Sequence, residues 1–90
     1  MKGLELKNYE FAVGQAEFET GIVLKKDGTY YKNTEDISEI YRIFDSLENA
    51  KSFAIMTVKD NPTIECFVSN CDGELVFVCD NKGERKQSSI

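Results

Sequence analysis

Apolar and polar residues alternate along two early segments of the chain, the pattern of β-strands with one solvated face. The alternation covers residues 9–13 and, after a break at residues 14–16, residues 18–24. Asp27-Gly28 is a strong hairpin signal. We therefore expect a turn there and a short third strand over residues 29–31.

The spacing of apolar residues then changes from two to three or four, which is typical of an amphipathic helix. The predicted helix covers residues 35–48, with Asn33 or Thr34 as its cap and acidic residues in its first turn. Its apolar stripe consists of Ile37, Ile40, Tyr41, Phe44 and Leu47.

Three more strands are expected after this helix. Residues 53–58 are apolar nearly throughout, as in a strand that is covered on both faces. Residues 63–69 and 74–80 are separated by Asn70-Cys71-Asp72-Gly73, which indicates a hairpin turn.

The predicted order is β-β-β-α-β-β-β. It indicates an α+β fold, with an antiparallel sheet of about six strands and one amphipathic helix packed on one face. The chain has 90 residues, which suits a single domain with one modest core. We expect residues 1–83 to form that domain and residues 84–90 to be a polar, frayed tail.

The charge balance limits the classes of partner. Sixteen acidic residues against eleven basic ones give a net charge of −5. This argues against direct binding of nucleic acid or of an anionic membrane surface, and it is compatible with a basic protein partner. The chain has no apolar segment long enough to span a bilayer, and its first residues lack a signal-peptide pattern. We expect a cytoplasmic protein of a bacterium, an archaeon or a virus-infected host cell.

Most catalytic and metal-binding chemistry lacks its usual residues here. The sequence has no histidine, and its six glycines form no phosphate-binding motif. We therefore predict no enzyme activity, catalytic residue, metal site or cofactor. Cys66 and Cys79 fall in the last two predicted strands. They lie opposite each other if the turn is a two-residue loop, whereas a bulge at Gly73 would place Val78 opposite Cys66. In either register we interpret them as small structural residues.

One acidic face is the main candidate for a binding site. Glu35, Asp36, Glu39, Asp45 and Glu48 would share the outer face of the predicted helix with a single base, Arg42. Such a face raises the rate and selectivity of binding to a basic surface. Tyr30 and Tyr31 are adjacent in a predicted strand, so one of them should face outward as an interface anchor. The carboxylates of Glu17 and Glu19 are interpreted as a solvated strand face.

These features predict a non-enzymatic, acidic protein-binding module. The hypothesis is an inhibitor, in the manner of immunity proteins or virus-encoded anti-defence proteins, that blocks a basic nucleic-acid-processing partner. One alternative is a structural or accessory subunit that forms a homodimer through its sheet. A further alternative is a small-molecule-binding domain.

Overall fold

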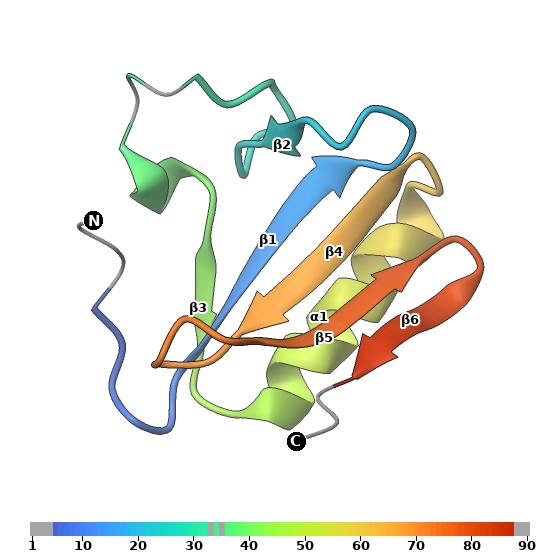
Figure 1. Ribbon diagram of the computed structural model, residues 1–90. Helices are drawn as coiled ribbons and strands as arrows, with labels where there is room; N and C mark the ends of the chain where they lie inside the picture. The colour runs from blue at the N-terminus through green and yellow to red at the C-terminus, as the bar shows by residue number, and fades with distance from the viewer. Residues whose placement is uncertain (1–4, 33, 35, 88–90) are drawn as a thin grey trace.

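The computed structural model describes residues 5–32, 34 and 36–87 and contains one helix packed against an antiparallel sheet (Figure 1). This confirms the predicted α+β fold class. The elements in chain order are β1 (Phe11–Glu17), β2 (Val23–Leu24), the 3-10 turn η1 (Ile37–Glu39), β3 (Arg42–Phe44), α1 (Leu47–Asp60), β4 (Ile64–Ser69), β5 (Leu75–Asp80) and β6 (Gly83–Gln87).

The sheet is built around β1 and β4. Its strand order is β2-β1-β4-β5-β6, and β3 also pairs with β1. All pairings are antiparallel. β4 runs along β1 from the pair Ala12–Ser69 to the pair Glu17–Ile64. β2 and β3 share the opposite edge of β1, β3 next to its first half and β2 next to its second half.

The predicted position of the helix was wrong. Residues 36–46 form a 3-10 turn, an extended strand and a bend, and the helix begins only at Leu47. Ser46 sets this start, because its backbone is extended and its hydroxyl accepts a hydrogen bond from the Asn49 N–H at 3.1 Å. A serine in this position satisfies one of the amide groups that a helix leaves free at its N-terminus.

The apolar run over residues 53–58, predicted as a strand, lies inside α1. Ala50, Ala54 and Val58 recur every four residues and are buried against the sheet. Ile55 and Met56 lie on the outer side of the same helix, 40% and 63% exposed. Only part of the run is therefore buried: Ala54 and Val58 face the sheet, whereas Ile55 and Met56 face outward.

Other predicted elements changed their extent. β1 passes through residues 14–16, where a break was expected, and the strand predicted over 18–24 is reduced to β2. The turn at Asp27-Gly28 is present, but the expected third strand is only a bridge between Leu24 and Tyr30. The tail predicted to be frayed contains β6 instead, and residues 88–90 lie outside the described part of the chain.

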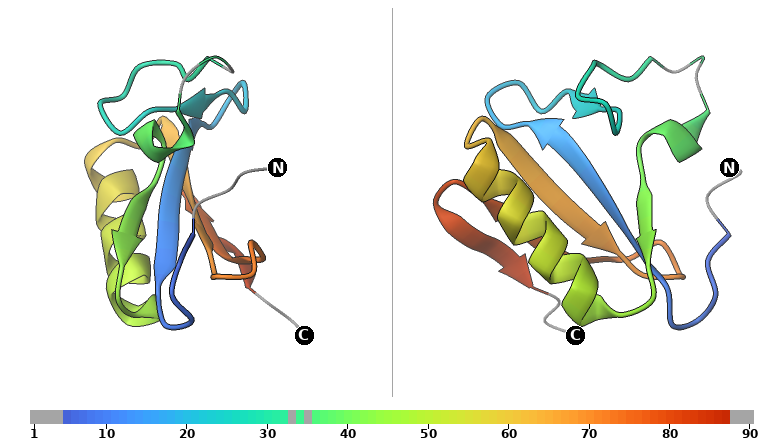
Figure 2. Two further views of the ribbon diagram at one scale, coloured as in Figure 1. Left: turned by 90° about the vertical axis from the view of Figure 1, so that its left-hand side faces the viewer. Right: turned by 180° about the vertical axis from the view of Figure 1, so that it is seen from behind.

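The core lies between α1 and one face of the sheet (Figure 2, left). It consists of Val13, Leu24, Ala50, Ala54, Val58, Ile64, Cys66, Val68, Phe77 and Cys79. On the opposite face, the rings of Tyr41 and Phe67 pack edge to face over Gly14, with 6.3 Å between their centroids.

Candidate functional site

The acidic residues predicted to bind a partner do not share one helical face. Asp36 caps η1 and Glu39 is its last residue, whereas Asp45 lies in the bend before α1 and Glu48 in its first turn, beyond the other end of β3 (Figure 1). Glu35 lies outside the described residues. The four described acids are exposed. Sequence reasoning joined two separate acidic groups because it extended one helix through the strand that lies between them.

Some of these acids also stabilise local structure. The Asp36 carboxylate accepts a hydrogen bond from the Ser38 N–H at 2.9 Å, and this bond lowers its pKa. Asp45 accepts a hydrogen bond from the Asn49 side chain at 3.3 Å. Glu48 lies in the first turn of α1, where a negative charge suits the helix dipole. All remain on the surface and can still act on a partner through their charge.

A different acidic group lies at one end of the sheet, where β1 ends and β4 begins; we call this the loop end. Glu17, the last residue of β1, accepts hydrogen bonds from the Thr20 hydroxyl at 2.8 Å and from the Tyr30 hydroxyl at 3.2 Å. Tyr30 is 52% exposed. Its hydrogen bond to Glu17 raises the pKa of Tyr30, so that the phenol stays protonated and continues to donate. This bond links the exposed ring to the end of β1.

Two hollows lie on either side of Glu17. One, of about 450 Å³, is lined by Glu17, Leu24, Gly28, Thr29, Tyr30, Asn61, Thr63 and Ile64. The other, of about 340 Å³, is lined by Glu17, Phe18, Glu19, Pro62, Thr63 and Asn81. Glu17 lines both hollows and Glu19 lines the smaller one, and neither hollow has a lysine or arginine among the described residues of its wall. The loop end therefore suits a cationic side chain.

The η1 turn adjoins the loop end through the hairpin that carries Tyr30. The Lys26 N–H donates to the Glu39 carbonyl at 2.7 Å, and Arg42 donates to the Lys26 carbonyl at 3.3 Å. Glu39, one of the predicted binding residues, thus lies beside this hairpin. The sequence suggested Tyr30 and Glu17 separately, but their contact spans thirteen residues and no local pattern indicated it.

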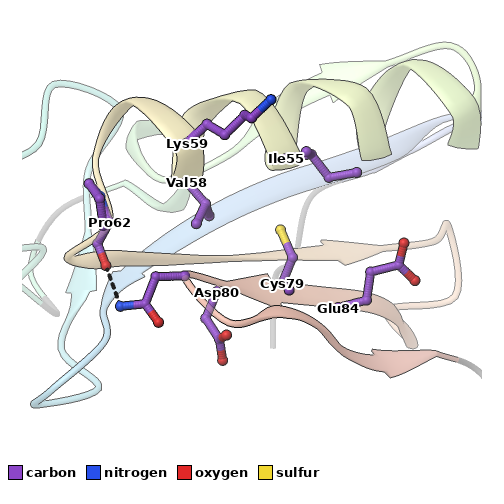
Figure 3. A pocket seen from close by; sticks show the side chains of 9 residues that line it. Ile55, Val58, Lys59, Pro62, Cys79, Asp80 and Glu84 are labelled. Carbon is purple, nitrogen blue, oxygen red and sulfur yellow. Dashed lines mark hydrogen bonds between the residues drawn. The ribbon is translucent and has the colours of Figure 1, made fainter.

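A further hollow is a groove of about 510 Å³ between α1 and the β5–β6 hairpin, which we call the α1–β5 groove (Figure 3). Ile55 and Val58 form its helix side, and the Cys79 side chain points from β5 toward the helix. At one end, the Asn81 side chain donates to the Pro62 carbonyl at 3.1 Å and joins the two loops. The groove is mainly apolar and has Lys59 and Glu84 in its wall.

The cysteine pair has no features of a nucleophile. Cys66 lies directly opposite Cys79, which is one of the two registers that the sequence left open. The turn itself is not a two-residue loop, because the Asn70 N–H donates to the Glu74 carbonyl, and a shift of the ladder between Val68 and Ser69 produces the observed pairing. All three thiols are free. Burial raises the pKa of Cys66 to about 12, and burial followed by the charge of Asp80 raises the pKa of Cys79. A thiol that rarely ionises is a poor nucleophile and a poor metal ligand.

Thiol labelling at pH 8 should therefore distinguish Cys71 from the buried Cys66. We expect Cys71, partly exposed in the β4–β5 turn, to react with iodoacetamide at an ordinary rate. A pKa near 12 leaves about one thiol in 10⁴ ionised at this pH, so Cys66 should react roughly 10³-fold more slowly than a free thiol. Peptide mass spectrometry measures each site, and labelling in urea is the control. Equal rates at Cys66 and Cys71 in the native protein would contradict the burial of β4.

Within the described residues, no group of three or more His, Cys, Asp or Glu side chains is arranged to hold a metal ion. No helix in this part of the chain is both long and apolar enough to cross a membrane. No protein-family model, curated protein or solved structure matches the chain.

Proposed function

We propose that this protein is a non-enzymatic, acidic protein-binding domain that blocks a basic surface on a nucleic-acid-processing partner. The supporting observation is the geometry of the loop end. Tyr30 is exposed, donates a hydrogen bond to Glu17 and lines the larger hollow, and the described residues that line the two hollows include Glu17 and Glu19 but no lysine or arginine. Such a surface fits a lysine or arginine side chain of a partner.

The physical reason is complementarity in both charge and shape. A cationic side chain that enters either hollow would lie near Glu17, and in the smaller hollow also near Glu19. A partly desolvated ion pair of this kind is stronger than one on an open surface. The Tyr30 ring adds a flat face on which an arginine can stack. Tyrosine and arginine are the residue types that most often dominate binding energy in protein interfaces.

The net charge of the whole chain supports the same function. A charge of −5 attracts a basic partner over distances longer than a contact, which raises the association rate at low salt. Surfaces that bind nucleic acid are basic because they neutralise phosphates. An acidic domain that occupies such a surface excludes the nucleic acid by direct competition.

Two charge-reversal variants test where the partner binds. The loop-end variant carries Glu19→Lys and Glu39→Lys, and the control variant carries Asp45→Lys and Asp72→Lys. All four residues are exposed, and each variant changes the net charge by the same amount. Partners are captured from native extract with tagged wild type, identified by mass spectrometry, purified, and titrated with each variant.

We expect the captured partner to be basic and to lose nucleic-acid binding when wild type is added. The loop-end variant should bind at least about 30-fold more weakly than wild type, mainly through a slower association rate, whereas the control variant should lose only the part due to net charge. Tyr30→Ala should weaken binding by about 10- to 100-fold without a change in salt dependence. Equal losses in both variants would leave only a general charge effect and would contradict a binding site at the loop end.

A further inference from the structure

The outer side of α1 carries an exposed stripe that the sheet leaves uncovered. Its members are spaced at four, three, one and three residues and lie on one side of the helix: Glu48, Ser52, Ile55, Met56 and Lys59. We call this the α1 stripe. Ile55 and Met56 are 40% and 63% exposed. Figure 2 (right) shows α1 as the outermost layer on its side of the sheet.

The exposed Ile55 side chain lies between two hollows of the surface. On its N-terminal side, a hollow of about 400 Å³ is lined by Leu47, Glu48, Lys51, Ser52 and Ile55. On its C-terminal side lies the α1–β5 groove, which Ile55 also lines. Ser52 is a small side chain next to a large one, so another helix can approach closely at this point. The stripe thus carries both a branched side chain, Ile55, and a hollow at Ser52 that could receive the same side chain of another copy.

The charges at the two ends of the stripe are opposite. Glu48 lies in the first turn of α1 and Lys59 in the last, about 16 Å apart along the axis. A second helix that lies antiparallel to the first brings Glu48 of each copy beside Lys59 of the other. A parallel arrangement would place like charges together, which disfavours association.

We propose that a second copy of this chain docks antiparallel on the α1 stripe. The two-fold axis lies between Ser52 and Ile55, so that Ile55 of each copy enters the hollow at Ser52 of the other. Glu48 and Lys59 pair at both ends. Such an interface is isologous, with the same surface patch contributed by each copy. Its Lys59 end adjoins the loop end through Asn61 and Pro62, but the proposed dimer does not depend on the proposed function.

The expected dimer is weak. One pair of short helices buries less area than the roughly 1,200–2,000 Å² of a standard stable interface. We therefore expect a dissociation constant on the order of 10⁻⁵ M, with monomer below this concentration and dimer above it. Sedimentation equilibrium from about 1 to 500 µM covers both states.

Two isoleucine variants test the contact surface. Ile55→Glu should weaken the dimer by at least about 30-fold, because it places two charges in the centre of the interface. Ile43→Glu is the matched control, since Ile43 is 43% exposed but lies in β3, and this variant should dimerise as wild type does. Circular dichroism checks that each variant is folded. A wild type that stays monomeric at 500 µM would overturn the proposal, as would an Ile55→Glu variant that still dimerises.

Charge exchange tests the antiparallel orientation. Glu48→Lys alone and Lys59→Glu alone should each weaken the dimer by about 10-fold, because each places like charges at both ends. An equimolar mixture of these two variants should regain association as a heterodimer, since every end then pairs opposite charges. If each substitution weakened the dimer only by destabilising its own helix, mixing the two variants would not restore association. If the mixture associates no better than the separate variants, the antiparallel arrangement is wrong.

Discussion

Replacing Phe77 by alanine should lower the free energy of unfolding by about 3–5 kcal/mol. Phe77 is only 1% exposed and lies opposite Val68 in the sheet, on the face covered by α1. The Lys51 ammonium group also lies over its ring, 5.0 Å from the centroid. Removing the ring loses apolar burial and this contact, and it leaves a cavity that neighbouring strands cannot fill. Urea denaturation measures the loss.

Leu75→Ala is the control for this substitution. Leu75 lies in the same strand but is 39% exposed, so its truncation should cost less than about 1 kcal/mol. If Phe77→Ala proves too unstable to purify, Phe77→Leu provides a smaller change that should still cost more than Leu75→Ala. Similar unfolding energies for the Phe77 and Leu75 variants would contradict the assigned orientation of β5.

Gly14→Ala should destabilise the fold by about 1–3 kcal/mol, although alanine usually stabilises a strand relative to glycine. A Cβ atom on Gly14 would lie 2.6 Å from Phe67 Cζ and 3.1 Å from Tyr41 Cε1. The first distance is shorter than any real carbon contact, so at least one ring must move. Thermal or urea denaturation should show this sign reversal.

A double-mutant cycle identifies the cause. With Phe67→Ala as the background, the ring that opposes the new methyl group is gone, and Gly14→Ala should become neutral or stabilising. The expected coupling energy is about 1–3 kcal/mol. If Gly14→Ala destabilises both backgrounds equally, then the close approach of Phe67 is not the reason for glycine at this position.

The helix shows where reasoning from periodicity failed. The predicted stripe has helical spacing, but Ile37, Ile40, Tyr41 and Phe44 are β-branched or aromatic residues, which favour extended structure. Helix-forming residues are concentrated after Ser46, where Ala50 and Ala54 form the buried face. Alanine was not counted as a core residue, although it lets a helix lie close to a sheet. Propensity together with the Ser46 cap would have indicated the observed boundary.

Local hairpins were easier to predict than long-range pairings. The turn at residues 70–73 and the alternation on both of its sides predicted the β4–β5 hairpin but left two registers open, and the structure has the one with Cys66 opposite Cys79. The pairing of β1 with β4 joins residues about fifty positions apart in the sequence. It depends on how α1, which lies between these strands in the chain, packs against the sheet. No local pattern contains that information. The same limit applies to the contact between Glu17 and Tyr30 at the loop end.

The divided edge of β1 has a consequence for association in concentrated solution. An uninterrupted seven-residue edge would offer a row of backbone amides and carbonyls to any unfolded or misfolded chain. Here β3 pairs with Phe11–Val13 and β2 with Gln15–Ala16, so that two short strands cover most of this edge and leave a break at Gly14. Neither short strand is long enough to template a further ladder. This side of the sheet should therefore resist the edge-to-edge growth that leads to amyloid-like fibres.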